Sequence, residues 1–243
     1  MKRTMSIFAI LLSIAALAFA QTNAQFAKAN QEFAHGDFKA AIEDYESLVR
    51  DGQDAPNLFY NLGNAYFRTN DFGHAILNYE RALALDPRHP EAQANVRIAR
   101  DEAHALELAP SRWEQIFSFA TENQFVIATA VSFWIALFSI AAFSFNRRRA
   151  LLALFILSMS IFVIALVASY ELDRGKSGPR AAIVTRDNTE ARLATADTAS
   201  RVLTLPAGSE IKIVSKRGDW IYATLPNDLR GWMPASSAEQ VRM

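Results

Sequence analysis

The sequence predicts a multidomain membrane protein that combines an α-helical repeat stack, two transmembrane helices and a small all-β barrel. Three observations lead to this prediction. A stretch of sequence returns in similar form after about 34 residues, which indicates a stacked helical repeat. Two apolar runs are long enough to cross a bilayer, and the last part of the chain alternates in the manner of short β-strands.

Charge is distributed unevenly along the chain. The 25 basic and 25 acidic residues cancel, which excludes a strongly basic nucleic-acid binder, and the absence of cysteine excludes disulfide scaffolds and cysteine-based metal or nucleophile chemistry. Residues 21–122, however, hold 9 basic and 16 acidic residues, whereas residues 171–243 hold 11 basic and 9 acidic residues. The first segment is therefore strongly acidic and the second weakly basic.

The N-terminus has the pattern of a secretory signal. Lys2 and Arg3 precede an apolar stretch from Met5 to Ala20 that ends in small residues. This stretch is short for a bilayer crossing, so residues 1–20 are predicted to be a signal peptide cleaved after Ala20, with an uncleaved anchor as the alternative. In both cases the segment that follows is exported.

The acidic segment contains two similar copies of one sequence pattern. Residues 36–42 align with residues 70–76, and at the same shift Tyr45 aligns with Tyr79. The second copy resembles the tetratricopeptide repeat, a helix–turn–helix unit in which small residues allow close helix approach and aromatic residues fill the space between helices. The matching residues are Phe59, Leu62, Gly63, Tyr66, Ala75, Tyr79, Ala82 and Pro87.

The first copy matches the pattern less well, and a third helix closes the stack. Gln25, Lys28 and Glu32 replace the expected apolar residues, as is typical of a solvated outer helix. A helix from about Pro90 to Leu106 has its apolar residues on one face and would cover the open end. Residues 21–108 are therefore predicted to form two repeats plus a capping helix.

The tetratricopeptide resemblance implies a peptide-binding groove along the first helix of each pair. Asparagine side chains there can bond a peptide backbone, and aromatic rings can hold apolar side chains. In the alternative interpretation the phenylalanines only pack the stack. The register of the repeat gives the lining as Asn23, Phe26, Asn30, Phe33, Asn57, Tyr60, Asn61, Asn64, Phe67 and Arg68. The candidate binding residues are Phe26, Asn30, Tyr60, Asn61, Asn64, Phe67 and Arg68.

The groove lacks the residues of a carboxylate clamp. Asn30 and Asn61 occupy the positions at which some tetratricopeptide proteins hold a terminal carboxylate. The basic residues that complete such a clamp are replaced here by Phe26, Glu91 and Asn95. We therefore expect no clamp for a C-terminal carboxylate.

Two uncharged runs predict a transmembrane hairpin. Residues 123–146 and 150–170 are each long enough to span a bilayer, and neither has a polar face, which argues against buried helices of a soluble core. Three arginines in the turn at residues 147–149 place that turn in the cytoplasm. Both flanking segments would then lie outside. The preceding segment, residues 109–122, carries the interfacial residues Trp113, Ile116, Phe117 and Phe119.

After a linker at residues 171–180, residues 181–239 predict a small antiparallel barrel of five short strands. The motifs Leu205-Pro206-x-Gly208, Gly218-Asp219-Trp220 and Gly231-Trp232-x-Pro234 resemble the bacterial SH3 domain. The turn at residues 192–195 departs from that family's pattern, so its ligand contacts are not carried over. Trp220, Tyr222 and Trp232 form the candidate ligand face; alternatively, at least one tryptophan fills the core.

Nothing in the sequence favours an enzyme, a metal site or a cofactor. No glycine-rich phosphate loop and no nucleophile elbow occur. The four histidines lack metal-ligand spacing, and His35 and His74, which lie near turns, are predicted to be exposed.

The order of these parts resembles the BatE-like, tetratricopeptide-containing members of the Bat (aerotolerance) group. The segments at residues 61–67 and 75–83 contribute to this resemblance. It implies a non-enzymatic scaffold in the bacterial inner membrane, with both terminal domains in the periplasm. Implied partners are membrane proteins with von Willebrand A domains and a MoxR-type ATPase system. The alternative is an envelope-anchoring protein that binds peptidoglycan through its SH3-like domain.

Overall fold

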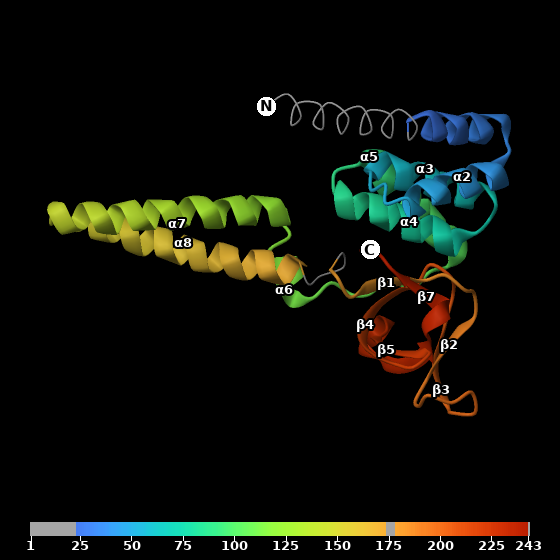
Figure 1. Cartoon of the computed structure of the whole chain (residues 1–243). Helices are drawn as coiled ribbons and strands as arrows, with labels where there is room; N and C mark the ends of the chain where they lie inside the picture. The colour runs from blue at the N-terminus through green and yellow to red at the C-terminus, as the bar shows by residue number, and fades with distance from the viewer. Residues whose placement is uncertain (1–22, 174–177, 243) are drawn as a thin grey trace, which may run out of the picture. The chain divides into compact units, whose positions relative to one another are not determined.

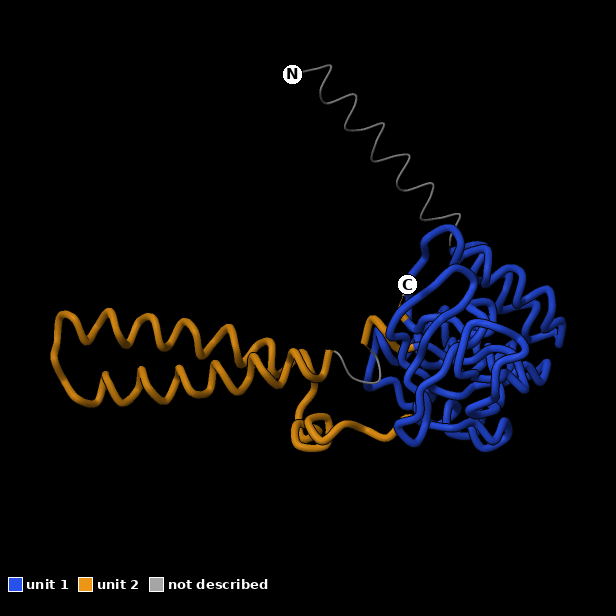
Figure 2. The backbone as a smooth tube through the Cα atoms, turned by 90° about the horizontal axis from the view of Figure 1, so that it is seen from below, with its two compact units in different colours: residues 1–107, 182–241, 243 blue, residues 108–181, 242 orange. Residues whose placement is uncertain are grey.

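The structure, a computed structural model, describes residues 23–173 and 178–242 (Figure 1). The predicted signal peptide and part of the linker lie outside the described residues. The chain separates into two compact units (Figure 2). We call the described residues 23–107 and 182–241 the repeat–sheet unit, and the described residues 108–173, 178–181 and 242 the hairpin unit.

The first part of the repeat–sheet unit is a stack of antiparallel helices. Residues 23–35 are helical, and prolines occupy the first turns of two later helices, where a missing N–H costs nothing. Asp71 caps another helix by accepting the His74 backbone N–H at 3.2 Å. The further helices are α2 (Phe38–Arg50), α3 (Pro56–Arg68), α4 (Phe72–Leu85) and α5 (Pro90–Ala103).

The repeat register recurs in the core of the stack. Tyr45 of α2 and Tyr79 of α4 are each 1% exposed, and the alanines at positions 41 and 75 are fully buried. Gly63 of α3 lies so close to the Tyr79 ring that a Cβ there would come within 2.7 Å of it. As predicted, the small residues let the helices approach closely and the aromatic residues fill the space between them.

The second part of this unit is a seven-stranded sheet in the order β3-β2-β6-β5-β4-β1-β7. The register-paired strands are antiparallel. Five strands were expected; β2 and β7 are additional, because they are short and polar and alternate only weakly. The strands are β1 (Ala181–Val184), β2 (Thr189–Arg192), β3 (Arg201–Leu205), β4 (Glu210–Arg217), β5 (Trp220–Thr224), β6 (Arg230–Pro234) and β7 (Ala238–Gln240).

The core of the sheet contains no tryptophan among the described residues. Its most buried side chains are aliphatic or thioether groups, among them Leu205, Ile211, Leu225 and Met233. The expectation that a tryptophan fills this core is wrong. The aromatic residues of β5 and β6 alternate with buried residues and so lie on the opposite face of their strands.

The sheet packs directly against α4 and α5 of the stack. A Cβ on Gly73 would lie 2.7 Å from the carbonyl oxygen of Thr185, which follows β1, and one on Gly208 would collide with the Ile76 side chain. Leu106 packs against the sheet's core. Its N–H donates to the Ser209 hydroxyl at 3.1 Å and its carbonyl accepts from the Glu210 N–H at 2.8 Å. The segments before and after the hairpin therefore fold together as one unit.

The hairpin unit consists of the short helix α6 (Arg112–Ile116) and two long helices, α7 (Glu122–Phe145) and α8 (Arg149–Asp173), which lie side by side (Figures 1 and 2). Both long helices are apolar and long enough to cross a membrane. Small residues are buried between them: Ser132, Ala136 and Ser139 of α7, and Ser158, Ala165 and Ala168 of α8.

Large apolar side chains on the long helices point outward. Phe138 is 66% exposed and Leu157 is 59% exposed. Of the predicted interfacial residues, Phe117 is buried and contacts the Phe125 ring edge-on, with 5.7 Å between the ring centroids. Trp113, Ile116 and Phe119 are exposed.

Candidate peptide-binding groove

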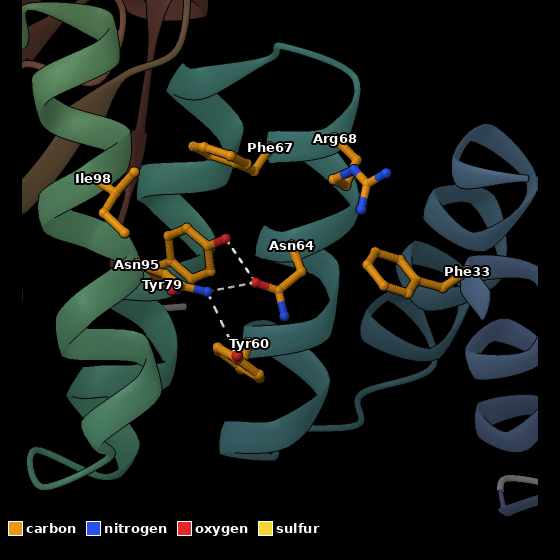
Figure 3. A pocket seen from close by; sticks show the side chains of 8 residues that line it. All are labelled: Phe33, Tyr60, Asn64, Phe67, Arg68, Tyr79, Asn95 and Ile98. Carbon is orange, nitrogen blue, oxygen red and sulfur yellow. Dashed lines mark hydrogen bonds between the residues drawn. The ribbon is translucent and has the colours of Figure 1, made fainter. Parts of the chain in front are cut away.

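A pocket of about 290 Å³ opens along the first helices of the stack (Figure 3). Its centre is formed by α3, with the helix of residues 23–35 on one side and α5 on the other. Apolar rings and one aliphatic side chain form the walls, and amide groups lie between them. The lining residues are Phe33, Tyr60, Asn64, Phe67, Arg68, Tyr79, Asn95 and Ile98.

A repeated hydrogen-bond unit holds the asparagines of the groove in place. The Asn64 side-chain oxygen accepts from the Tyr79 hydroxyl at 2.8 Å and from the Asn95 amide at 2.9 Å. One repeat earlier, the Asn30 oxygen accepts from the Tyr45 hydroxyl at 2.6 Å and from the Asn61 amide at 2.9 Å. The same asparagine–tyrosine–asparagine unit thus occurs once in each repeat.

Burial keeps the tyrosines of this unit protonated as donors. It raises the pKa of Tyr45 to about 12 and raises the pKa of Tyr79 as well. Each hydroxyl therefore fixes the orientation of one asparagine, with its oxygen turned toward the stack and its NH₂ group turned away from that bond.

The unit leaves a set of polar atoms without a partner. Among residues 23–173 and 178–242, no hydrogen bond is made by the side-chain NH₂ groups of Asn30 and Asn64 or by the side-chain oxygens of Asn61 and Asn95. Two donors and two acceptors therefore remain along the groove.

The predicted groove residues fall into three places. Tyr60, Asn64, Phe67 and Arg68 line the pocket. Asn30 and Asn61 belong to the hydrogen-bond unit of the first repeat. Phe26 lies in a second pocket of about 240 Å³ with Asn23, Leu48, Gln53, Ala55, Asn57 and Leu58.

The sequence named Asn95 only as a residue at a clamp position, and it did not place Ile98 and Tyr79 in the groove. One further shift of the repeat leads from Asn61 and Asn64 to Asn95 and Ile98, so the signal for these two was present in the sequence. The role of Tyr79 could not be read from the register, because its body packs inside the stack while its hydroxyl reaches the pocket.

The phenylalanines of the groove also take part in packing. The Phe33 ring contacts Phe38 with 5.3 Å between centroids, and at the equivalent positions of the second repeat Phe67 contacts Phe72 at 5.4 Å. Both phenylalanines of the lining remain only partly buried. Packing and exposure to the pocket are therefore combined in the same side chains.

The three aromatic residues predicted as a ligand face of the sheet are brought together. Tyr222 of β5 lies directly opposite Trp232 of β6, with 5.0 Å between ring centroids, and Trp220 lies opposite Pro234. All three rings are half-buried. Tyr222 and Trp232 thus form a ring pair across two neighbouring strands, and Trp220 lies on the same face of β5.

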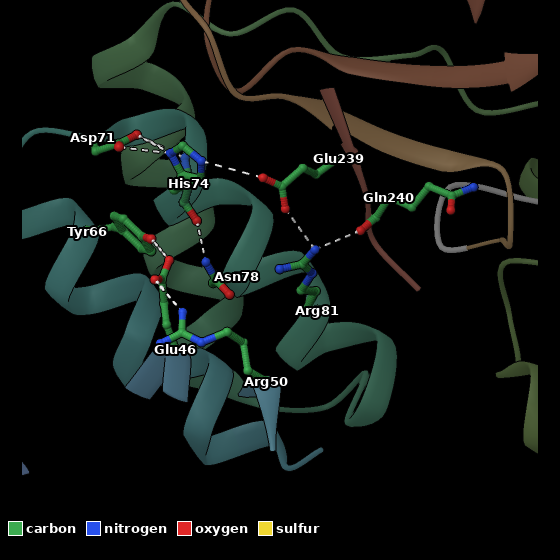
Figure 4. A network of polar contacts seen from close by, with 9 residues as sticks. All are labelled: Glu46, Arg50, Tyr66, Asp71, His74, Asn78, Arg81, Glu239 and Gln240. Atoms are coloured by element: carbon green, nitrogen blue, oxygen red, sulfur yellow. Dashed lines mark hydrogen bonds and ion pairs between the residues drawn. The ribbon is translucent and has the colours of Figure 1, made fainter. Parts of the chain in front are cut away.

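A separate polar network joins the stack to the end of the sheet (Figure 4). His74 lies between Asp71, at 2.8 Å, and Glu239 of β7, at 3.7 Å. Arg81 donates to the Glu239 carboxylate at 3.2 Å and to the Gln240 carbonyl at 3.1 Å. The prediction that His74 is exposed is wrong: its side chain is 30% exposed, because it stacks on the Tyr66 ring and lies beside Asp71 and Glu239.

The charges of this network stabilise one another. The hydrogen bond with Asp71, aided by Glu239, raises the pKa of His74 to about 9, so the imidazole is charged at neutral pH. In return, the His74 imidazolium, 3.7 Å away, lowers the pKa of the Glu239 carboxyl. His35, the other histidine expected at the surface, is exposed.

Residues 26–90 match the model of the tetratricopeptide repeat family. The matched region contains both repeats and ends at the first residue of α5. The repeat resemblance deduced from Phe59–Pro87 is thereby confirmed. A comparison with curated proteins gives no match.

Proposed function

We propose that this chain is a membrane-anchored, non-enzymatic scaffold whose tetratricopeptide groove holds an extended segment of a protein partner. Tetratricopeptide repeats are protein-interaction modules, which supports the general role. The observation that carries the proposal is the row of unpartnered asparagine donors and acceptors beside two pockets.

A row of this kind suits a peptide backbone. An extended peptide presents N–H and C=O groups in alternation, and side-chain amides can bond both. The amide groups are already oriented by the tyrosine hydroxyls, so less conformational entropy is lost when a peptide binds. The two pockets would each receive an apolar side chain.

The features of the hairpin unit support the membrane part of the proposal. Large apolar side chains cover the outside of α7 and α8, and exposing them to water would cost free energy. The segments before and after the hairpin belong to one compact unit, and this is compatible only with an even number of crossings between them. Arg147, Arg148 and Arg149 favour a cytoplasmic turn and hence a periplasmic repeat–sheet unit.

The resemblance to the Bat group supplies the candidate partners. They are von Willebrand A-domain membrane proteins and a MoxR-type ATPase system in the bacterial inner membrane. The acidic repeat domain would hold a segment of such a partner close to the outer surface of that membrane.

Replacing Ile98 with glutamate tests the groove. Ile98 is 50% exposed and lines the pocket, so a carboxylate there blocks the apolar site without removing a core residue. We expect the variant to lose partner crosslinking in native membranes by about tenfold or more. The readout is photocrosslinking from a benzoylphenylalanine at position 67.

The matched control is Arg97→Glu. Arg97 is exposed on the same helix, bonds the Gln93 carbonyl at 3.0 Å and is absent from the pocket lining. It should leave the crosslinks unchanged. Equal yields from the Ile98→Glu and wild-type chains would show that partners bind elsewhere.

A second candidate function rests on the aromatic surface of the sheet. Because Trp220, Tyr222 and Trp232 are not needed to fill the core, we propose that they contact peptidoglycan as in an SH3-like anchoring domain. The detergent-solubilised full chain should then sediment with purified wall sacculi, and Tyr222→Ala with Trp232→Ala should abolish this. Wild-type protein that stays in the supernatant would refute the candidate.

A further inference from the structure

We infer that the groove selects a segment in which a large apolar side chain lies next to an aspartate or glutamate. Arg68 would form an ion pair with the acidic group. This inference rests on the proposed groove function and specifies its ligand. It follows from the size of the pocket, the polar atoms in it and the charge of one lining residue (Figure 3).

The pocket has room for one large side chain. Its volume of about 290 Å³ lies at the lower limit of pockets that hold small molecules, which is ~300 Å³. The rings of Phe33 and Phe67 and the exposed Ile98 provide apolar walls. A phenylalanine, leucine or tryptophan side chain would be stabilised there by removal from water.

Asn64 and Asn95 fix where the backbone of the ligand runs. The free NH₂ group of Asn64 and the free side-chain oxygen of Asn95 belong to one hydrogen-bond unit. They can receive a carbonyl and an N–H of the residue whose side chain enters the pocket. The neighbouring residue of the ligand then passes the rim of the pocket, where Arg68 lies.

Arg68 is a cation available for pairing. Its guanidinium carbon lies 4.6 Å from the centroid of the Phe38 ring, which holds the group at the rim. Among the described residues no carboxylate lies within ion-pair distance of it. Several other basic residues of the stack are already paired, for example Lys28 with Asp44 and Arg50 with Glu46.

The charge of the surroundings makes this cation selective. With 9 basic and 16 acidic residues, the segment of residues 21–122 repels an acidic ligand in general. An acidic residue is favoured only where it meets an unpaired guanidinium, and there the charge-assisted hydrogen bonds are strong. The groove therefore accepts one acidic group at one place and disfavours a polyacidic segment.

Peptides of defined sequence test the inference. The probes are short fluorescein-labelled peptides on a glycine–serine background, each with one phenylalanine and one aspartate at successive distances from it. Matched peptides carry asparagine or lysine instead of aspartate. Binding to the detergent-solubilised full chain is measured by fluorescence anisotropy.

At the best spacing the aspartate peptide should bind about tenfold more tightly than the asparagine peptide, and the lysine peptide more weakly still. Arg68→Glu should reverse this order, so that the lysine peptide binds best. Arg68 is exposed, so this variant keeps its fold, and Arg97→Glu, which changes charge equally outside the pocket, should keep the wild-type order.

The possible results distinguish a failure of this inference from a failure of the proposed groove function. If all phenylalanine peptides bind equally and Ile98→Glu still abolishes binding, the groove function stands and the role of Arg68 is refuted. If the order is the same in wild type and Arg68→Glu, the inference is again refuted. If no peptide binds, or if Ile98→Glu changes nothing, both the inference and the proposed groove fail.

Discussion

Replacing Arg100 with alanine is expected to lower the free energy of unfolding of the repeat–sheet unit by about 3–5 kcal/mol. The Arg100 guanidinium of α5 pairs with Glu80 of α4 at 2.5 Å and with Glu210 of β4. The exposed fractions of the three side chains are only 12%, 13% and 9%. Without the cation, two nearly buried carboxylates would lose the guanidinium group that they share.

Hydrogen exchange of the full chain in detergent, followed peptide by peptide, measures this effect. Protection should fall in α4, in α5 and at the start of β4, because Arg100 joins these three elements. Arg97→Ala, one turn away on the surface of α5, is the control and should change stability by no more than about 0.5 kcal/mol. If Arg100→Ala matched this control, the ion cluster would not be holding the sheet to the stack.

Replacing Gly73 with lysine is expected to separate the sheet from the stack at a cost of about 3 kcal/mol. A Cβ at this position would lie 2.7 Å from the Thr185 oxygen and 3.0 Å from its Cα, and backbone atoms cannot move aside as a flexible side chain can. The counterpart of Gly73 in the first repeat is Lys39, which is exposed. A long side chain is thus compatible with the helix and incompatible only with the sheet.

The same exchange experiment distinguishes separation from unfolding. In Gly73→Lys, amides of β1 and β7 should lose protection while those of α3, which faces the other side of α4, keep it. Lys39→Ala serves as the control because no sheet covers the first repeat at that position. Wild-type exchange in Gly73→Lys would mean that this close contact does not hold the two parts together.

Local patterns in the sequence were enough for most of the architecture. The shift that aligns Tyr45 with Tyr79 predicted both repeats, and it also related Asn30 to Asn64 in the groove. The two apolar runs predicted α7 and α8 within a few residues. Five strands could be read from alternation, whereas β2 and β7 could not, since their polar residues give no apolar face.

The expectations that failed concern residues whose surroundings come from distant parts of the chain. His74 was expected to be exposed because it lies near a turn, but its ring stacks on Tyr66 and lies beside Glu239. A tryptophan was expected in the core of the sheet on grounds of size. Aliphatic residues fill that core instead, and the aromatic rings of β5 and β6 remain on the other face.

The sequence by itself determined the helices, the repeat and the apolar hairpin, because each depends on periodicities within a short stretch of chain. Only the tertiary structure decided that the side-chain oxygens of Asn30 and Asn64 accept hydrogen bonds and that the sheet docks on α4 and α5. Arg100 and Glu210 form an ion pair although they are 110 residues apart in the sequence, with the whole hairpin between them in the chain. Contacts of that kind depend on the shapes and charges of two surfaces that exist only after each part has folded. Such complementarity leaves no periodic pattern in the sequence of either segment.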